Sequence, residues 1–104
     1  MTPDELFDAV AEAHLGDPGV TEGRMFGSPC LKISGKVFAC LVKGELVVKL
    51  PSARVDELAL RGGAARFDPG MGTQMKEWAA VAPRAAEEWV DLSAEARDFV
   101  ASLL

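Results

Sequence analysis

Three apolar runs in the first half of the chain are separated by two-residue turns that end in glycine. The runs cover residues 30–33, 36–42 and 45–50, and the turns between them are Ser34-Gly35 and Lys43-Gly44. Such turns are typical of β-hairpins, because their backbone needs a positive φ that glycine adopts without strain. The pattern therefore predicts an antiparallel meander in which Gly35 has a positive φ.

The Ser34-Gly35 turn also predicts which side chains share a face of the sheet. It pairs Ile33 with Lys36, and therefore Leu31 with Phe38. In this register one face carries Leu31, Ile33, Phe38, Cys40 and Val42, and the other carries Val37, Ala39 and Leu41. Both faces are apolar, so we expect helices to cover one face and a partner to cover the other. Phe38 is expected in the core between the sheet and the helices.

The same register places the two cysteines on opposite faces. Cys30 and Cys40 are then predicted to be free thiols, at least one of them buried as a small hydrophobic side chain. A turn of three residues would reverse this placement, so a redox pair remains the alternative interpretation.

Three other segments have the spacing of amphipathic helices. In the first, Thr2 and Glu5 form a capping-box sequence ahead of an apolar stripe. The second covers about residues 53–61, with Ser52 as its expected N-cap. The third covers about residues 89–103.

Short strands are expected near residues 65–67 and 75–81, and Val20–Met25 is a candidate first strand. The order of helix, strands, helix, strands and helix predicts an α+β fold. We expect a two-layer domain with a curved antiparallel sheet of about five strands and with helices at the N-terminus, in the middle and at the C-terminus. A chain of 104 residues is expected to form one domain, spanning residues 1–104.

Composition narrows the classes of function. No apolar run approaches the roughly 20 residues that span a bilayer, and the acidic start lacks the basic and apolar regions of a signal peptide. Two cysteines do not make a disulfide framework. We therefore expect a cytoplasmic protein that does not bind membranes.

Charge is unevenly distributed along the chain. The net charge is −5, yet residues 20–54 hold six bases and only two acids. The overall negative charge argues against a nucleic-acid binder, because such proteins gain affinity by neutralising phosphates. The basic segment nevertheless leaves a second hypothesis open, the binding of an anionic ligand or a nucleic acid on the sheet.

No motif in the chain predicts catalytic residues, a cofactor or a metal site. His14 is the only histidine, and no His, Cys or Asp cluster has the spacing of metal ligands. Residues 70–73 resemble a phosphate loop but lack its Gly-Lys-Ser/Thr ending. A flexible connection or a partner-binding loop is the preferred interpretation there, and a small ligand is left open. We therefore expect a protein that is not an enzyme.

Several segments together resemble a known family. They are residues 24–27 (Arg-Met-Phe-Gly), 35–39 (Gly-Lys-Val-Phe-Ala), 46–49 (Leu-Val-Val-Lys), Phe67 with the glycine-rich loop after it, and 75–78 (Met-Lys-Glu-Trp). On these residues the chain resembles the N-terminal domain of the TfoX/Sxy family of competence regulators, with the YjbR/MmcQ-like domains as the broader match. The resemblance implies an α+β fold with a curved antiparallel sheet, a regulatory or binding role, and no catalytic residues or cofactor.

The favoured hypothesis is a small cytoplasmic regulatory or adaptor domain that binds a protein. Its candidate interaction surface consists of bases of the predicted sheet and one aromatic side chain: Arg24, Lys32, Lys36, Lys49 and Trp78. The partner is expected to be an unidentified protein or a second copy of the chain. Phe26 and Phe38, the aromatic residues of the basic segment, are both expected to be buried, so nucleic acid is not the expected partner.

Overall fold

The computed structural model describes residues 1–25, 27–70, 72 and 74–104. Within these residues the chain forms a six-stranded sheet, three α-helices and one 3-10 turn, which confirms the α+β prediction. The helices are α1 (Pro3–His14), α2 (Ser52–Arg61) and α3 (Trp89–Ser102), and the 3-10 turn η1 (Pro83–Glu88) precedes α3. The strands are β1 (Val20–Met25), β2 (Ser28–Ile33), β3 (Lys36–Val42), β4 (Glu45–Lys49), β5 (Ala64–Phe67) and β6 (Met75–Val81). The sheet has six strands, compared with the prediction of about five, because the candidate first strand Val20–Met25 does form.

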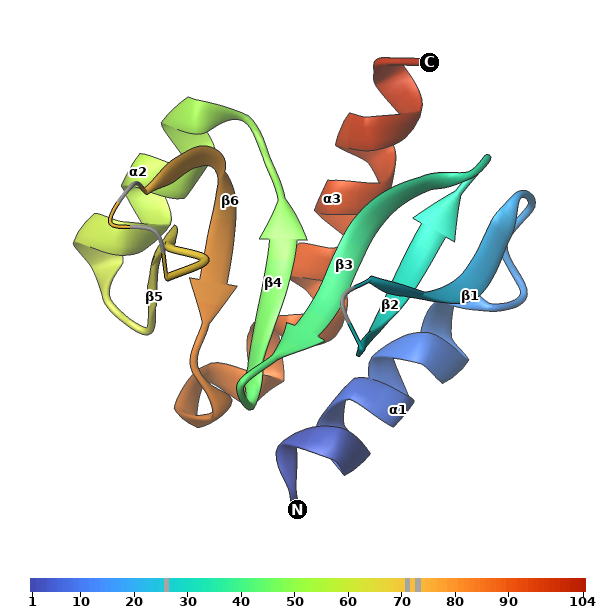
Figure 1. The fold of residues 1–104 in the computed structure, drawn as a ribbon, viewed down its shortest axis with the longest axis horizontal. Coiled ribbons are helices and arrows are strands. Elements are labelled where there is room, and N and C mark those ends of the chain that lie inside the picture. The colour runs from blue at the N-terminus through green and yellow to red at the C-terminus, as the bar shows by residue number, and fades with distance from the viewer. Residues whose placement is uncertain (26, 71, 73) are drawn as a thin grey trace.

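The strands make one antiparallel sheet in the order β1-β2-β3-β4-β6-β5. Helix α3 packs on β3 and β4, α1 packs on α3 and β3, and α2 packs on β5 and β6. Buried side chains of all three helices join the same core, so the helices cover one side of the sheet. In Figure 1, α3 passes behind β3 and β4. We call that side the helix-covered face and the opposite side the open face.

Both predicted glycine turns have a positive φ at each of their two central residues. The angle φ is 49° at Ser34 and 83° at Gly35, and 51° at Lys43 and 78° at Gly44. Type I′ turns of this kind preserve the right-handed twist of the strands that they join. The predictions of a tight hairpin and of a positive φ at Gly35 are confirmed.

The start of α1 agrees with the capping-box sequence, whereas the start of α2 does not follow the prediction. The backbone N–H of Glu5 donates to Thr2 Oγ1 (3.2 Å), and that of Thr2 donates to Glu5 Oε1 (2.9 Å). Ser52 is not an N-cap: Pro51 takes that position, and no side chain caps α2. Proline cannot donate to a sheet ladder and has a φ suited to helix entry, so the helix begins one residue earlier than expected.

A β-bulge interrupts the register between β2 and β3. Ile33 pairs with Lys36 as predicted, but Leu31 pairs with Ala39 instead of Phe38. Phe38 is therefore the extra residue of β3, and a bulge shifts the alternation of side chains by one position.

The bulge reverses the predicted faces for the rest of β3. Phe38 and Ala39 both contribute to the core on the helix-covered face, and Leu41 follows on the same side. Cys40 and Val42 lie on the open face. The predicted face assignment is therefore wrong beyond Phe38, while Phe38 itself is fully buried in the core as expected.

The helix-covered face carries the main hydrophobic core. Its fully buried side chains are mostly large and come from the sheet and from all three helices: Val10, Leu31, Phe38, Leu46, Val48, Leu50, Val55, Leu58, Val81 and Trp89. Trp89 also donates its indole N–H to the carbonyl oxygen of Ala82 (3.1 Å). Burial of side chains of this size is the main source of stability for a domain.

Candidate functional site

A row of small side chains crosses the open face from one edge of the sheet to the other. The paired residues of successive strands, from β1 to β5, are Gly23, Cys30, Cys40, Val47, Ala80 and Ala65. The four central residues of this row are buried and form a second, smaller core on the side away from the described helices. Because these side chains are small, the middle of the open face is hollow.

A groove of about 770 Å³ lies in this hollow. Its floor includes Cys40 and Val47, and its walls are larger apolar side chains from β1, β3, β5 and β6: Met25, Val42, Phe67, Met75 and Trp78. Ser28, Lys43, Asp68 and Pro69 complete the lining. A volume of this size falls within the range of roughly 300–1,000 Å³ found for ligand pockets. The apolar walls suit an apolar occupant.

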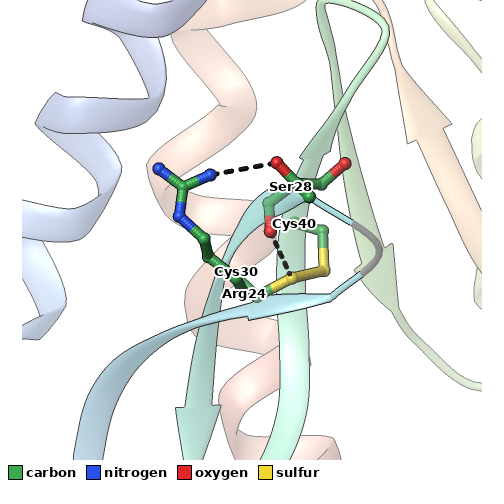
Figure 2. The surroundings of a disulfide bond; sticks show 5 residues. Arg24, Ser28, Cys30 and Cys40 are labelled. Atoms are coloured by element: carbon green, nitrogen blue, oxygen red, sulfur yellow. Dashed lines mark hydrogen bonds between the residues drawn. A yellow bond between two sulfur atoms is a disulfide. The ribbon is translucent and has the colours of Figure 1, made fainter.

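A disulfide joins Cys30 and Cys40 across β2 and β3 (Figure 2). The two Cα atoms are 4.1 Å apart, and the residues form a directly opposed pair. The prediction of two free thiols is therefore wrong, although both residues are buried. The cause is the bulge at Phe38, which turns Cys40 to the same face as Cys30.

Polar groups lie at the rim of the groove. Lys43, in the β3–β4 turn, and Asp68, which follows β5, are both exposed. The Nζ atom of Lys49 lies 5.8 Å from the ring centroid of Trp78, a cation–π contact. The Asp68 carboxylate also accepts a hydrogen bond from the backbone N–H of Gly70 (2.8 Å). The groove is thus apolar in its middle and carries charges of both signs at its rim.

The five predicted surface residues are divided between the two faces. Lys32, Lys49 and Trp78 occupy register positions on the open face, and of these Trp78 lines the groove. Arg24 and Lys36 occupy positions on the side of the helix-covered face. Arg24 donates a hydrogen bond to a backbone carbonyl in the β1–β2 turn (3.0 Å; Figure 2). The structure therefore places three of the five on the open face, and of these Lys49 and Trp78 are in contact.

Sequence reasoning did not single out most residues of the groove. Met25, Val42, Val47, Phe67 and Met75 are apolar residues of five different strands, and nothing in their spacing signals that they meet. The one available signal was the apolar character of both faces of the central strands, which predicted a covered second face.

The basic segment 20–54 does not form a single charged patch. Arg54 is ion-paired with Glu57 and Glu95. Among the described residues, the other five bases have no ion pair, and they are divided between the two faces and one turn: Arg24, Lys32, Lys36, Lys43 and Lys49.

His14 belongs to a polar cluster on the opposite side from the groove. Its Nδ1 atom lies 3.3 Å from Oδ2 of Asp17, and Arg97 of α3 contacts the same carboxylate. The hydrogen bond from His14, and after it the one from Arg97, lowers the pKa of Asp17. The cluster links the end of α1 to α3 and has a structural role.

Some predictions concern residues that are not described. Phe26, expected to be buried, and two residues of the glycine-rich loop, Met71 and Thr73, lie outside the described residues. In the described part of the chain, no three His, Cys, Asp or Glu side chains are grouped so that they could hold a metal ion. No helix in that part has the length and apolar character needed to cross a bilayer.

A comparison of the sequence with protein-family models identifies one family that covers most of the chain. The family model of the TfoX N-terminal domain matches residues 11–101, which include every residue of the groove and both cysteines. A search of curated proteins found no match.

Proposed function

The chain belongs to the family of TfoX N-terminal domains, and on that premise we propose that it is a small cytoplasmic regulatory or adaptor domain that binds a protein partner in the groove of the open face. It acts by binding and not by catalysis. The observation that carries the proposal is the apolar groove of about 770 Å³ on the face away from the described helices.

The chemistry of the groove walls suits a protein ligand. A sheet face that only water covers normally carries polar side chains, whereas this face carries a half-buried tryptophan and two exposed methionines. Tryptophan is enriched among the residues that contribute most to binding energy at protein interfaces. Met25 and Met75 have flexible side chains that adapt to irregular surfaces. Trp78 is therefore the expected anchor of the interface.

The rim of the groove indicates the charge of the partner. Lys43 and Lys49 have no ion pair within the described residues, and Asp68 is the acid that lines the groove. A segment that inserts apolar side chains between the walls and presents carboxylates to these lysines fits both features. A second copy of the chain is the alternative occupant.

Affinity capture with matched variants tests the proposal. The full chain is cross-linked in native lysate, and captured proteins are identified by mass spectrometry. Trp78→Ala should reduce capture of the partner at least about tenfold, which corresponds to ~1.4 kcal/mol. Leu60→Ala is the matched control, because Leu60 is a 91% exposed apolar residue of α2 that does not line the groove. Equal capture by wild-type protein and Trp78→Ala, with both variants folded by circular dichroism, would contradict the proposal.

A second measurement separates protein binding from the binding of anions on the basic segment. We expect no binding of duplex DNA or single-stranded RNA in a fluorescence anisotropy titration at micromolar protein and physiological salt, because the bases are divided between faces. Submicromolar binding that Lys32→Glu or Lys49→Glu weakens, and that added salt weakens further, would favour the alternative. Sedimentation of the purified chain distinguishes a second copy from a different partner.

A further inference from the structure

We propose that Cys30 and Cys40 form a reversible dithiol–disulfide couple that sets the shape of the groove floor and, through it, the affinity of the groove for its partner. The effect on the partner rests on the proposed function. The redox couple itself rests only on the arrangement of the two cysteines.

The sheet holds the two sulfurs together in either redox state. Cys30 and Cys40 are directly opposed on adjacent antiparallel strands, with Cα atoms 4.1 Å apart. Hydrogen bonds of the ladder and the buried packing of Leu31 and Ala39 on the other face keep β2 and β3 in this register. The dithiol can therefore close to the disulfide, and the disulfide can open, without a rearrangement of the backbone.

The surroundings of the two sulfurs differ. Cys40 is 1% exposed but lines the groove, so the groove is the route that we assign to a small thiol or disulfide. The Sγ atom of Cys30 lies 3.5 Å from the carbonyl oxygen of Ser28 (Figure 2). A disulfide sulfur has no proton to donate, but a Cys30 thiol can donate to this carbonyl. Reduction thus gives Cys30 a hydrogen-bond partner and leaves Cys40 as the sulfur that faces the groove.

The chemistry is a two-electron exchange with a low-molecular-weight thiol or disulfide. In reduction, the thiolate of one small thiol attacks the disulfide and forms a mixed disulfide with Cys40, and Cys30 leaves as a thiolate that takes up a proton. A second small thiol then displaces Cys40. Two small thiols are oxidised to one disulfide, and the two protons that they lose equal the two gained by the cysteines. Oxidation is the reverse of these steps.

The redox state changes the floor of the groove because the floor is made of small side chains. Two bonded sulfurs are about 2 Å apart, and two thiols must separate to van der Waals contact. Val47 and Ala80, which continue the same row, are buried and packed. The Cys40 thiol therefore moves toward the groove when the bond breaks and makes the groove shallower.

The expected location of the protein makes such a couple useful. Disulfides are rare in a reducing cytoplasm, and those that form there are usually transient and are catalytic or redox-sensing. A bond that joins two already paired strands, and that a small molecule can reach through a groove, suits a sensing role.

The first experiment counts free thiols in the 104-residue chain. The protein is equilibrated with mixtures of reduced and oxidised glutathione or dithiothreitol. Free thiols are then alkylated, and their number is determined from the mass of the protein by mass spectrometry. We expect a reversible transition between molecules with no free thiol and molecules with two, with the far-ultraviolet circular dichroism unchanged. A disulfide that opens only when the protein unfolds would overturn the couple, and so would thiols that do not close under any oxidising mixture.

The second experiment measures the groove in the two redox states. The probe is the anionic dye anilinonaphthalene sulfonate, titrated by fluorescence. We expect its Kd to change at least about threefold on reduction, and we expect Trp78→Ala to weaken its binding. The double variant Cys30→Ala/Cys40→Ala is the control, and its affinity should not respond to reductant. A Kd that is equal in both redox states of the wild-type protein would overturn the link between the couple and the groove.

The two proposals can fail separately. In one outcome, the Kd of the dye changes with the number of free thiols, but Trp78→Ala captures the partner as well as the wild-type protein does. That outcome contradicts the proposed function and supports the redox couple. Partner capture that needs Trp78 but is the same in both redox states removes the regulation and retains the proposed function.

Discussion

The two faces of this sheet are built from the same strands but filled in opposite ways. The helix-covered face buries large side chains, with Phe38, Leu31 and Leu46 each fully buried. The open face places short side chains in its middle row and has Trp78 and the two methionines at its sides. One face is thus packed by the chain's own helices, and the other retains a volume of about 770 Å³.

The comparison shows that burial and filling are different properties. Cys30, Cys40 and Val47 are buried to nearly the same extent as the side chains of the main core. They are buried because they are short and flanked by taller neighbours, and not because a helix lies on them. A sequence position that is apolar and buried can therefore belong either to a core that holds the fold together or to the floor of a binding site. Four predictions, given in order of decreasing expected effect, test this difference between the packed core and the floor of the groove.

The largest effect is expected for Phe38→Ala on the helix-covered face. The substitution leaves a cavity in a packed core and should lower the free energy of unfolding by about 3–5 kcal/mol, a large part of the total for a small domain. Chemical denaturation measures the change. The neighbouring residue Val37 lies half-buried on the open face, and Val37→Ala is the matched control, with an expected loss of roughly 1 kcal/mol. Similar losses for the two variants would mean that the open face is packed as tightly as the other.

Reduction of the disulfide tests the open face directly. The bond closes a short loop, with a sequence separation of 10, and its loss should lower the free energy of unfolding by about 2–3 kcal/mol. Urea denaturation with and without reductant measures the difference. In the double variant Cys30→Ala/Cys40→Ala the reductant should have no effect on the urea midpoint. A wild-type protein with the same midpoint in both conditions would show that the disulfide does not contribute to stability.

Ser93→Ala should stabilise the protein by about 1 kcal/mol. Ser93 is fully buried in α3, and its hydroxyl has no hydrogen-bond partner in the described part of the molecule. Alanine removes that unpaired group and favours the helix. Ser102→Ala in the same helix is the control, because the Ser102 hydroxyl is exposed and donates to the carbonyl of Phe99 (2.6 Å). A loss of stability in Ser93→Ala would show that the hydroxyl has a partner after all.

The smallest effect is expected from acid and concerns only the helix layer. The pKa of Asp17 is lowered in the folded protein, first by the hydrogen bond from His14 and then by the one from Arg97. The unfolded state therefore binds a proton more readily, so this contribution is fully present above the ordinary aspartate pKa of about 3.9 and disappears as the pH falls through the lowered value. Thermal melts at pH values between 7 and 2 measure this effect. The melting temperature of Asp17→Asn should fall less on acidification than that of the wild-type protein, whereas that of Glu12→Gln should fall as it does in the wild-type protein. An unchanged acid profile in Asp17→Asn would contradict the prediction.

The sequence alone determined the elements and the class of the fold. Local rules are sufficient for this, because a capping box, a type I′ turn and a period of two or of 3.6 residues each depend on neighbours in the chain. The capping box of α1, the hairpin at Gly35 and strands β1 and β6 follow the sequence patterns. The burial of Phe38 could also be predicted, since its position lies next to a turn whose register is known.

Only the tertiary structure decided which side chains meet. A single extra residue at Phe38 shifts every later position of β3 to the other face, and the length of the Ser34-Gly35 turn does not reveal a bulge three residues after it. That shift placed Cys40 opposite Cys30, turned Val42 toward the groove and made the prediction of free thiols wrong. The groove itself combines side chains from six strands and needs the order of the strands, which depends on how the whole sheet pairs. Pairing between distant segments is set by the fit of the complete core and not by any local pattern.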